Sequence, residues 1–302
     1  MAMSPLPCLV FEYGDERGTK LYAAADGVYR PCEIGPLLTK RNWVTAQGWV
    51  LAWDPDTSAT FLWDPHDPEH GRVALPSFAQ ALPVGSNCTL SGDPTAPGGC
   101  TVSSPYESTV LWYCHTGSAT PEWVRHEYDL GGKLVKIGEH RTSWNKRHVF
   151  GLVPSGDKFY YPIHQNKCGV LEFSPEPRLS TVKTKGVKLT FHPIGDGCVN
   201  AYLSLLDLDD KLHMVWGFGR SRCVRVNNIG GRAILASSAG FHATWCPANK
   251  FRLRPNTVYW MSPYDNCLHM YDIGANKEVV HEYEGATELL RTPFWLVPVH
   301  RS

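Results

Sequence analysis

The chain has 302 residues, with 29 Lys and Arg against 29 Asp and Glu, so its formal net charge is zero. Charged residues make up only 19% of it and hydrophobic residues 43%, which excludes a disordered tail and the binding of nucleic acid through overall charge. Aromatic residues reach 12%, and 27 Gly and 23 Pro accompany them, a mixture typical of many short strands joined by tight turns. We therefore expect one all-β domain over residues 1–302.

The repeated pattern of the chain is an aromatic and β-branched run, a polar turn and a second apolar run, which predicts a β-hairpin. The starts of these hairpins lie roughly 40 to 60 residues apart, similar to the length of one propeller blade. Six segments follow the pattern in chain order: LVFEYGDERGTKLYAA from Leu9, VLAWDPDTSATFLWDP from Val50, TVLWYCHTGSATPEWVRHEYDL from Thr109, KFYYPIHQNKCGVLEFSP from Lys158, KLHMVWGFGRSRCVRV from Lys211 and VYWMSPYDNCLHMYDIG from Val258.

This spacing predicts a single β-propeller of six or seven four-stranded blades. Short apolar segments between the hairpins, such as Val199–Leu208 and Ala233–Ser237, supply further strands. The terminal segments Cys8–Tyr13 and Phe294–Val299 both have strand character, and their pairing in one blade would close the ring and remove its open edges. A pair of packed β-sandwiches is the alternative architecture.

The ends and the cysteines bear on the cellular compartment. Met1–Leu9 has neither the basic nor the apolar part of a signal peptide. No stretch of about 18 uncharged apolar residues occurs, so we expect no membrane span. The 10 cysteines are scattered singly, without a CxxC pair, which is typical of reduced and buried thiols. We expect a cytoplasmic or nuclear protein.

Three segments resemble the plant KIB-type β-propeller domain, and the resemblance extends from about Leu6 to about His300. They are GWVLAWDPDTSATFLWDP, WVRHEYDLGGKLVKIGEHRTSWNKRH and VYWMSPYDNCLHMYDIG. The resemblance implies a propeller without catalytic residues or cofactor. Many members of that family carry a helical F-box before the propeller and resemble substrate receptors of ubiquitin ligases.

The chain departs from this family pattern in two places. Strand character begins at Cys8, which leaves no room for an F-box, so direct docking to a ligase scaffold is not expected. The connection GFGRSR between Trp216 and Cys223 is short, which leaves open an incomplete blade near residues 216–223 with an exposed strand edge. A truncated family copy without retained activity is one interpretation of both departures.

A turn rich in acids and histidines follows Trp63. His66 and His70 stand four residues apart, a spacing that could place both rings on one metal ion if the segment were helical. Pro65 and Pro68 exclude a regular helix there. We therefore expect a solvated turn between blades and no metal site.

The segment Lys133–His148 is the basic counterpart, with five bases against a single acid. A basic stretch with an exposed aromatic side chain can bind phosphate or an acidic peptide. The candidate partner-binding residues in it are Arg141, Trp144, Arg147 and His148. An ordinary polar loop between blades is the alternative interpretation.

A second candidate surface lies in Ser237–Phe251. Its Ser, His and Cys residues do not form a recognisable nucleophile motif, because no GxSxG sequence precedes them and no orienting acid can be assigned. The segment could instead contribute Phe241, His242 and Trp245 to a loop face that binds a partner.

These patterns together predict a monomeric, non-catalytic domain that binds an unidentified protein or peptide, without cofactor, metal, nucleic acid or membrane. The alternative is an enzymatic or small-molecule-binding propeller with a site in its central channel. That alternative requires two or more acids, or three histidines, to converge on the channel.

Overall fold

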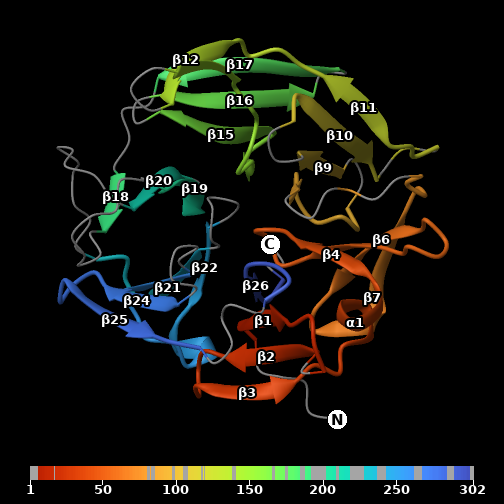
Figure 1. Ribbon diagram of the computed structural model, residues 1–302. Helices are drawn as coiled ribbons and strands as arrows, with labels where there is room; N and C mark the ends of the chain where they lie inside the picture. Colours follow the sequence, from red (N-terminus) through yellow and green to blue (C-terminus); the bar gives the residue numbers. More distant parts are fainter. Residues whose placement is uncertain are drawn as a thin grey trace.

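In this computed structural model, small β-sheets form a ring (Figure 1). Strand β26 (Phe294–Leu296) lies near the centre of the ring. The structure describes residues 6–16, 18–79, 82, 86–96, 99–104, 108–116, 118, 120–137, 141–164, 167–173, 176–183, 188–191, 202–208, 211–217, 228–236, 243–261, 267–283 and 289–299. The described helical elements are α1 (Gly35–Thr39) and a 3-10 turn at Asn249–Phe251. Within these residues no helix is long and apolar enough to span a membrane.

Five of the sheets have four or five strands and are arranged as the blades of a five-bladed β-propeller. From the centre outward, the first two blades consist of β26, β1 (Cys8–Glu12), β2 (Thr19–Ala23) and β3 (Val28–Pro31), and of β4 (Arg41–Val44), β5 (Val50–Trp53), β6 (Thr60–Asp64) and β7 (Asp67–Leu75).

The third blade consists, in the same order, of β8 (Asn87–Leu90), β9 (Cys100–Ser104), β10 (Val110–His115) and β11 (Val124–Glu127). The fourth consists of β14 (Val153–Ser155), β15 (Lys158–His164), β16 (Lys167–Phe173) and β17 (Pro177–Lys183). The fifth consists of β22 (Ala243–Pro247), β21 (Arg232–Ala236), β23 (Thr257–Met261), β24 (Leu268–Asp272) and β25 (Lys277–His281).

Five of the six predicted hairpins are antiparallel strand pairs within these blades, namely β1–β2, β5–β6, β10–β11, β15–β16 and β23–β24. The sixth is different. Strand β20 (Lys211–Gly217) pairs with two strands that precede it in the chain. It lies antiparallel to β19 (Tyr202–Leu208) and parallel to β18 (Lys188–Phe191), and the three strands form one sheet. The prediction of six or seven four-stranded blades is therefore wrong, because the apolar pattern after Lys211 marks a strand but not its partners.

The expected incomplete blade near residues 216–223 falls at the end of this three-stranded sheet. Trp216 and Gly217 are the last residues of β20. Residues 218–227 lie outside the described residues, so the predicted connection itself has no description.

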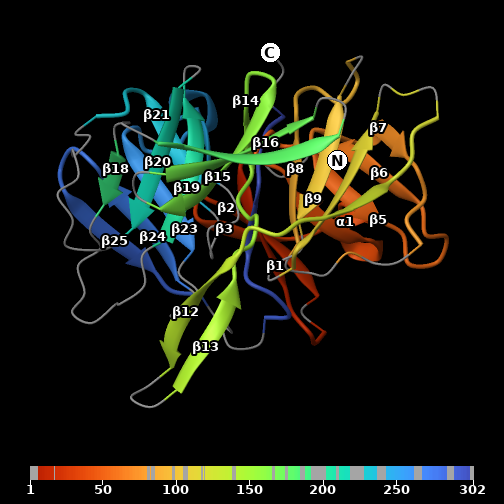
Figure 2. The ribbon, with the colours of Figure 1, turned by 90° about the horizontal axis from the view of Figure 1, so that it is seen from above.

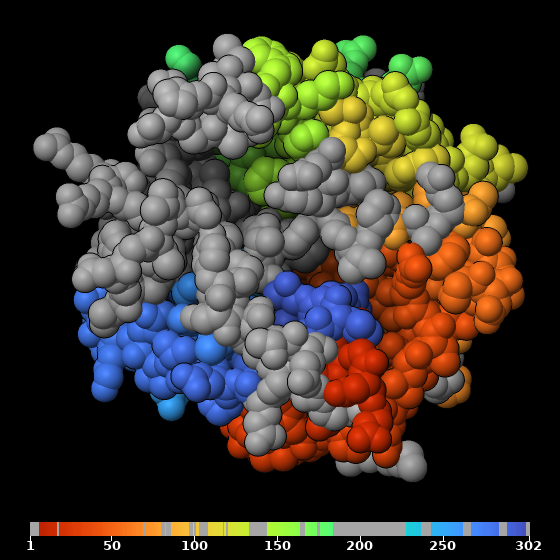
Figure 3. All heavy atoms as spheres, viewed as in Figure 1, coloured from red at the N-terminus to blue at the C-terminus, as the bar shows by residue number. Residues whose placement is uncertain are grey.

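The ring closes through its two terminal segments, as predicted. Strand β26 pairs with β1, with Trp295 opposite Leu9. Beyond the strands, the Leu290 amide donates to the Glu12 carbonyl at 2.8 Å, and the Arg291 guanidinium contacts the Glu12 carboxylate at 2.5 Å. In the space-filling view, C-terminal residues in dark blue lie beside N-terminal residues in red near the middle of this face (Figure 3).

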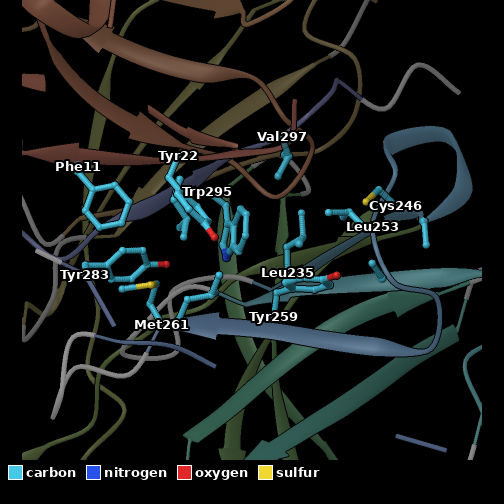
Figure 4. Packing of buried hydrophobic residues seen from close by; sticks show 14 of the residues in the cluster. Phe11, Tyr22, Leu235, Cys246, Leu253, Tyr259, Met261, Tyr283, Trp295 and Val297 are labelled. Carbon is cyan, nitrogen blue, oxygen red and sulfur yellow. The ribbon is translucent and has the colours of Figure 1, made fainter. Parts of the chain in front are cut away.

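The core consists of clusters between neighbouring blades, and aromatic residues dominate them. Figure 4 shows the cluster between the first and fifth blades, where Phe11, Tyr22, Tyr259 and Trp295 pack together. Trp63 has no exposed surface between the first and second blades. Most tryptophans with described side chains belong to these clusters or pack against them.

Seven cysteines of the described residues are buried and free, which fits the expected reduced thiols. Burial raises the pKa of the Cys8 and Cys88 thiols to about 12, because a thiolate loses its hydration in an apolar interior. Both thiols therefore remain protonated near neutral pH, as small apolar residues of the core.

Candidate partner-binding surface

A two-stranded hairpin, β12 (Gly132–Ile137) and β13 (Arg141–Lys146), stands apart from the blades. Figure 2 shows both strands extending away from the ring. Their antiparallel register places Leu134 opposite Trp144. The basic segment predicted from the sequence thus forms a regular hairpin, which is inserted between the third and fourth blades.

Hydrogen bonds at its base fix this hairpin to the third blade. The buried Tyr128 hydroxyl donates to the Ser108 carbonyl at 2.8 Å and accepts from the Val149 amide at 2.8 Å. The His148 Nδ1 lies 3.1 Å from the same Ser108 carbonyl, and the Arg147 amide bonds across the base at 2.9 Å. Burial raises the pKa of the Tyr128 hydroxyl, which keeps it protonated as a donor.

Trp144 is the exposed aromatic side chain of this hairpin. It is 61% exposed, whereas the other tryptophans with described side chains are buried or partly buried. A Cβ added to Gly132 would lie 2.5 Å from Nε1 and 2.6 Å from Cε2 of the indole, so the ring lies over the glycine. Since no side chain is present at Gly132, the backbone itself supports the ring, and one indole face stays open.

Replacing Gly132 by alanine is expected to displace the Trp144 indole, because the added methyl group would occupy its place. The indole N–H signal of Trp144 in a proton–nitrogen NMR spectrum should shift, and Trp144→Phe assigns that signal. Gly92→Ala is the matched control, since an added Cβ there meets no atom within 4 Å. An unchanged Trp144 signal in Gly132→Ala would contradict this packing.

The other predicted binding residues lie in different environments. Arg141 begins β13, in a part of the hairpin whose side chains are not described, and Arg147 is exposed just after the strand. Phe241 and His242 lie outside the described residues. Trp245 belongs to β22 of the fifth blade, so the hairpin and this second candidate segment stand in different sheets.

Trp245 is partly buried rather than free at a loop tip. It packs against the buried cluster that contains Ile234 and Tyr271. The guanidinium of Arg232 lies over its ring, with Cζ 4.9 Å from the centroid. These contacts are typical of a structural aromatic residue, so Trp144 carries the stronger case for partner binding.

The acidic turn after Trp63 connects β6 and β7 within the second blade, so the expected place between two blades is wrong, whereas the exposed His66, Asp67 and His70 confirm a solvated turn. Asp64 is only 1% exposed, and its carboxylate accepts from the His66 amide at 2.8 Å. His70 contacts Asp67 instead, at 3.1 Å. No group of three or more His, Cys, Asp or Glu side chains is placed to hold a metal ion among the residues that the structure describes.

The centre of the ring is bridged by the turn between β4 and β5. The Ala46 carbonyl accepts from the Thr244 hydroxyl of the fifth blade at 2.8 Å. The side-chain amide of Gln47 donates to the Leu90 carbonyl of the third blade at 3.2 Å. The innermost strands of the five blades, β4, β8, β14, β22 and β26, contain neither acids nor histidines, whereas β19, which contacts β14 and β22, contains Asp207. Among the described inner strands, the two acids or three histidines that the channel alternative requires are thus not brought together.

Sequence reasoning identified Trp144 and the basic segment, but it missed the groups that hold them. The contact of Trp144 with Gly132 and the anchoring role of Tyr128 depend on pairings across strands. The adjacent glycines Gly131 and Gly132 were the available signal, because consecutive glycines beside a strand indicate a close approach of another group.

No family model matches the chain, and no curated protein matches it. The resemblance to the KIB-type domain therefore stays a prediction. The propeller fold and the hairpin that it displays are the observations that bear on function.

Proposed function

We propose that the protein is a non-catalytic interaction domain that binds a protein or peptide partner through the β12–β13 hairpin. The observation that carries this proposal is the 61% exposure of Trp144 on a hairpin that stands outside the blades. A large exposed indole has little use in the packing of a propeller. Tryptophan is among the residues that contribute most binding energy at protein interfaces.

The anchored base of the hairpin supports the same proposal. Tyr128 and His148 hold the base to the Ser108 carbonyl, and Gly132 supports the ring of Trp144. A surface that is fixed before binding loses less conformational freedom on association. The protein thus presents its main contact in a prepared position.

Membership of the KIB-type family forms part of this proposal, with the propeller acting as a partner-binding module in the cytoplasm or nucleus. Such a module acts as a monomer and needs no cofactor. Docking to a ligase scaffold is not proposed, since no described segment supplies an F-box.

The proposal is tested by cross-linking capture with the full chain, followed by titration of the captured partner. Trp144→Ala is expected to weaken binding about 30-fold, which corresponds to the roughly 2 kcal/mol of a typical hot-spot residue. Val280→Ala, a truncation of a 48% exposed side chain on β25, is the matched control and should leave the affinity unchanged. Equal binding by both variants, with unchanged melting curves, would reject the hairpin as the contact.

A further inference from the structure

Two bases of the hairpin have no acidic partner among the described residues. Some bases elsewhere are paired, since Arg30 lies 2.6 Å from Asp26 and Lys158 lies 2.6 Å from Glu172, although no ion pair holds the exposed Arg178 of β17 among the described residues. Lys146 and Arg147 are exposed, and no described carboxylate lies within ion-pair distance of either. Their charges are therefore not neutralised within the described part of the molecule.

The register places one of these charges beside the exposed indole. Lys146 follows Trp144 by two residues in β13, so the two positions lie on the same face of the ribbon. Lys136 of β12, opposite Thr142, occupies a position of that same face. The whole chain has no net charge, so this face is a local positive site and not part of a general basic surface.

We infer that this face of the β12–β13 hairpin binds an acidic, extended segment of a partner protein. The inference rests on the proposed function and adds the chemistry of the partner. Carboxylates complement Lys146 on this face and the adjacent Arg147 just after the strand, and an apolar side chain of the segment covers the indole of Trp144. An extended chain fits because a two-stranded sheet has free backbone groups on both of its edges, to which a further strand can add.

Nucleic acid is a less suitable occupant. Its affinity comes from many phosphate contacts, which a neutral chain with one short basic ribbon supplies poorly. The exposed Trp144 contributes most against an apolar side chain, and a peptide that alternates acidic and apolar residues presents both groups at strand spacing.

A second copy of the chain would have to offer its own acidic segment, which is the stretch Leu51–His70. Three of the five acids there are engaged or buried within the blade, whereas Asp56 is exposed. Asp54 lies 3.0 Å from Lys40, and Asp67 lies 3.1 Å from His70. Asp64 is buried. The structure therefore favours a different protein over self-association.

Fluorescence anisotropy with the full chain tests this inference. The probe is a labelled peptide that alternates glutamate and valine, and its counterpart alternates lysine and valine. We expect the acidic peptide to bind and the basic peptide not to bind. The double variant Lys146→Glu with Arg147→Glu should weaken binding of the acidic peptide about tenfold or more, because each surface ion pair contributes up to about 1 kcal/mol and repulsion replaces it.

The matched control carries the same change of charge on an outer strand of the fourth blade. Arg178 and Lys183 of β17 are also exposed, and Arg178→Glu with Lys183→Glu should leave the affinity unchanged. Lys146→Gln with Arg147→Gln serves as the milder variant if charge reversal disturbs the hairpin. Its effect should lie between those of the wild type and the reversed variant.

Equal binding of the acidic and basic peptides would overturn the inference, and so would an equal loss of affinity in the control and hairpin variants. Two further results would contradict it. These are displacement of the acidic peptide by single-stranded DNA at equal charge concentration, and salt-sensitive dimerisation in sedimentation without peptide. The proposed function fails separately, if Trp144→Ala and Val280→Ala capture the natural partner equally. If Trp144→Ala abolishes capture of the natural partner while the reversed variant retains it, the hairpin binds a partner that is not acidic.

Discussion

Replacing Gly169 by alanine is expected to destabilise the protein by about 3 to 5 kcal/mol. The added methyl group would overpack the core and also displace the buried ring of Tyr161 from its native position. Gly169 of β16 lies opposite Tyr161 of β15. An added Cβ would fall within the Tyr161 ring, which has no exposed surface and packs between the third and fourth blades. The ring would have to leave this position, and the interior offers it no other place.

A double-mutant cycle tests the cause of this effect. Tyr161→Ala alone should also cost about 3 to 5 kcal/mol, because it removes a buried aromatic ring. The double variant with Gly169→Ala should be no less stable than Tyr161→Ala, since the methyl group then occupies space that the ring has vacated. The midpoint of denaturant unfolding measures all three variants. Additive losses would show that Gly169 is needed for another reason.

Among the described residues, the same arrangement of an aromatic ring over a glycine occurs in a blade and on the hairpin. Tyr161 covers Gly169 in the core, and Trp144 covers Gly132 at the surface. The packing is similar but the consequence differs, because the first ring is buried and the second is 61% exposed. The glycine in the blade is thus expected to serve stability, whereas the glycine of the hairpin supports an exposed ring that we propose as a partner contact.

Local signals in the sequence predicted most of the blades. Alternating apolar runs around a polar turn identify a hairpin whose strands are neighbours in sequence, as in Val50–Asp64. They do not identify pairings between distant segments. Strand β20 shows this limit, because its parallel partner β18 precedes it by about 20 residues and no turn residue connects the two directly. The predicted blade number was wrong for this reason.

The candidate site was predictable to the same degree. Composition showed that Lys133–His148 is basic and contains Trp144, since both are properties of the sequence. The exposure of that tryptophan depends on whether the segment packs on a blade, which composition does not specify. Trp245 was also a candidate contact residue, and yet it is partly buried beneath Arg232. Only the three-dimensional packing distinguishes these two tryptophans.

Gly48→Ala is the second substitution with a large expected effect, about 3 kcal/mol or more, because it acts where the ring is joined at its centre. Gly48 ends the turn between β4 and β5 with a φ of +92°. An added Cβ would overlap the Pro298 carbonyl oxygen and lie 2.8 Å from the Val299 Cα. These are backbone atoms, which cannot rotate away as a flexible side chain would. The preceding turn residues bond to the third and fifth blades, so a displaced turn weakens three connections together.

Gly18→Ala separates this overlap from the cost of a left-handed backbone. Gly18 also has a positive φ, +56°, but an added Cβ there meets no atom within 4 Å. Its replacement should cost only about 1 kcal/mol, the conformational term alone. The difference between the two free energies of unfolding therefore measures the contact of the turn with the C-terminal segment. If both variants lost the same stability, that contact would contribute nothing, and ring closure would depend on the pairing of β26 with β1 and on the Glu12–Arg291 ion pair.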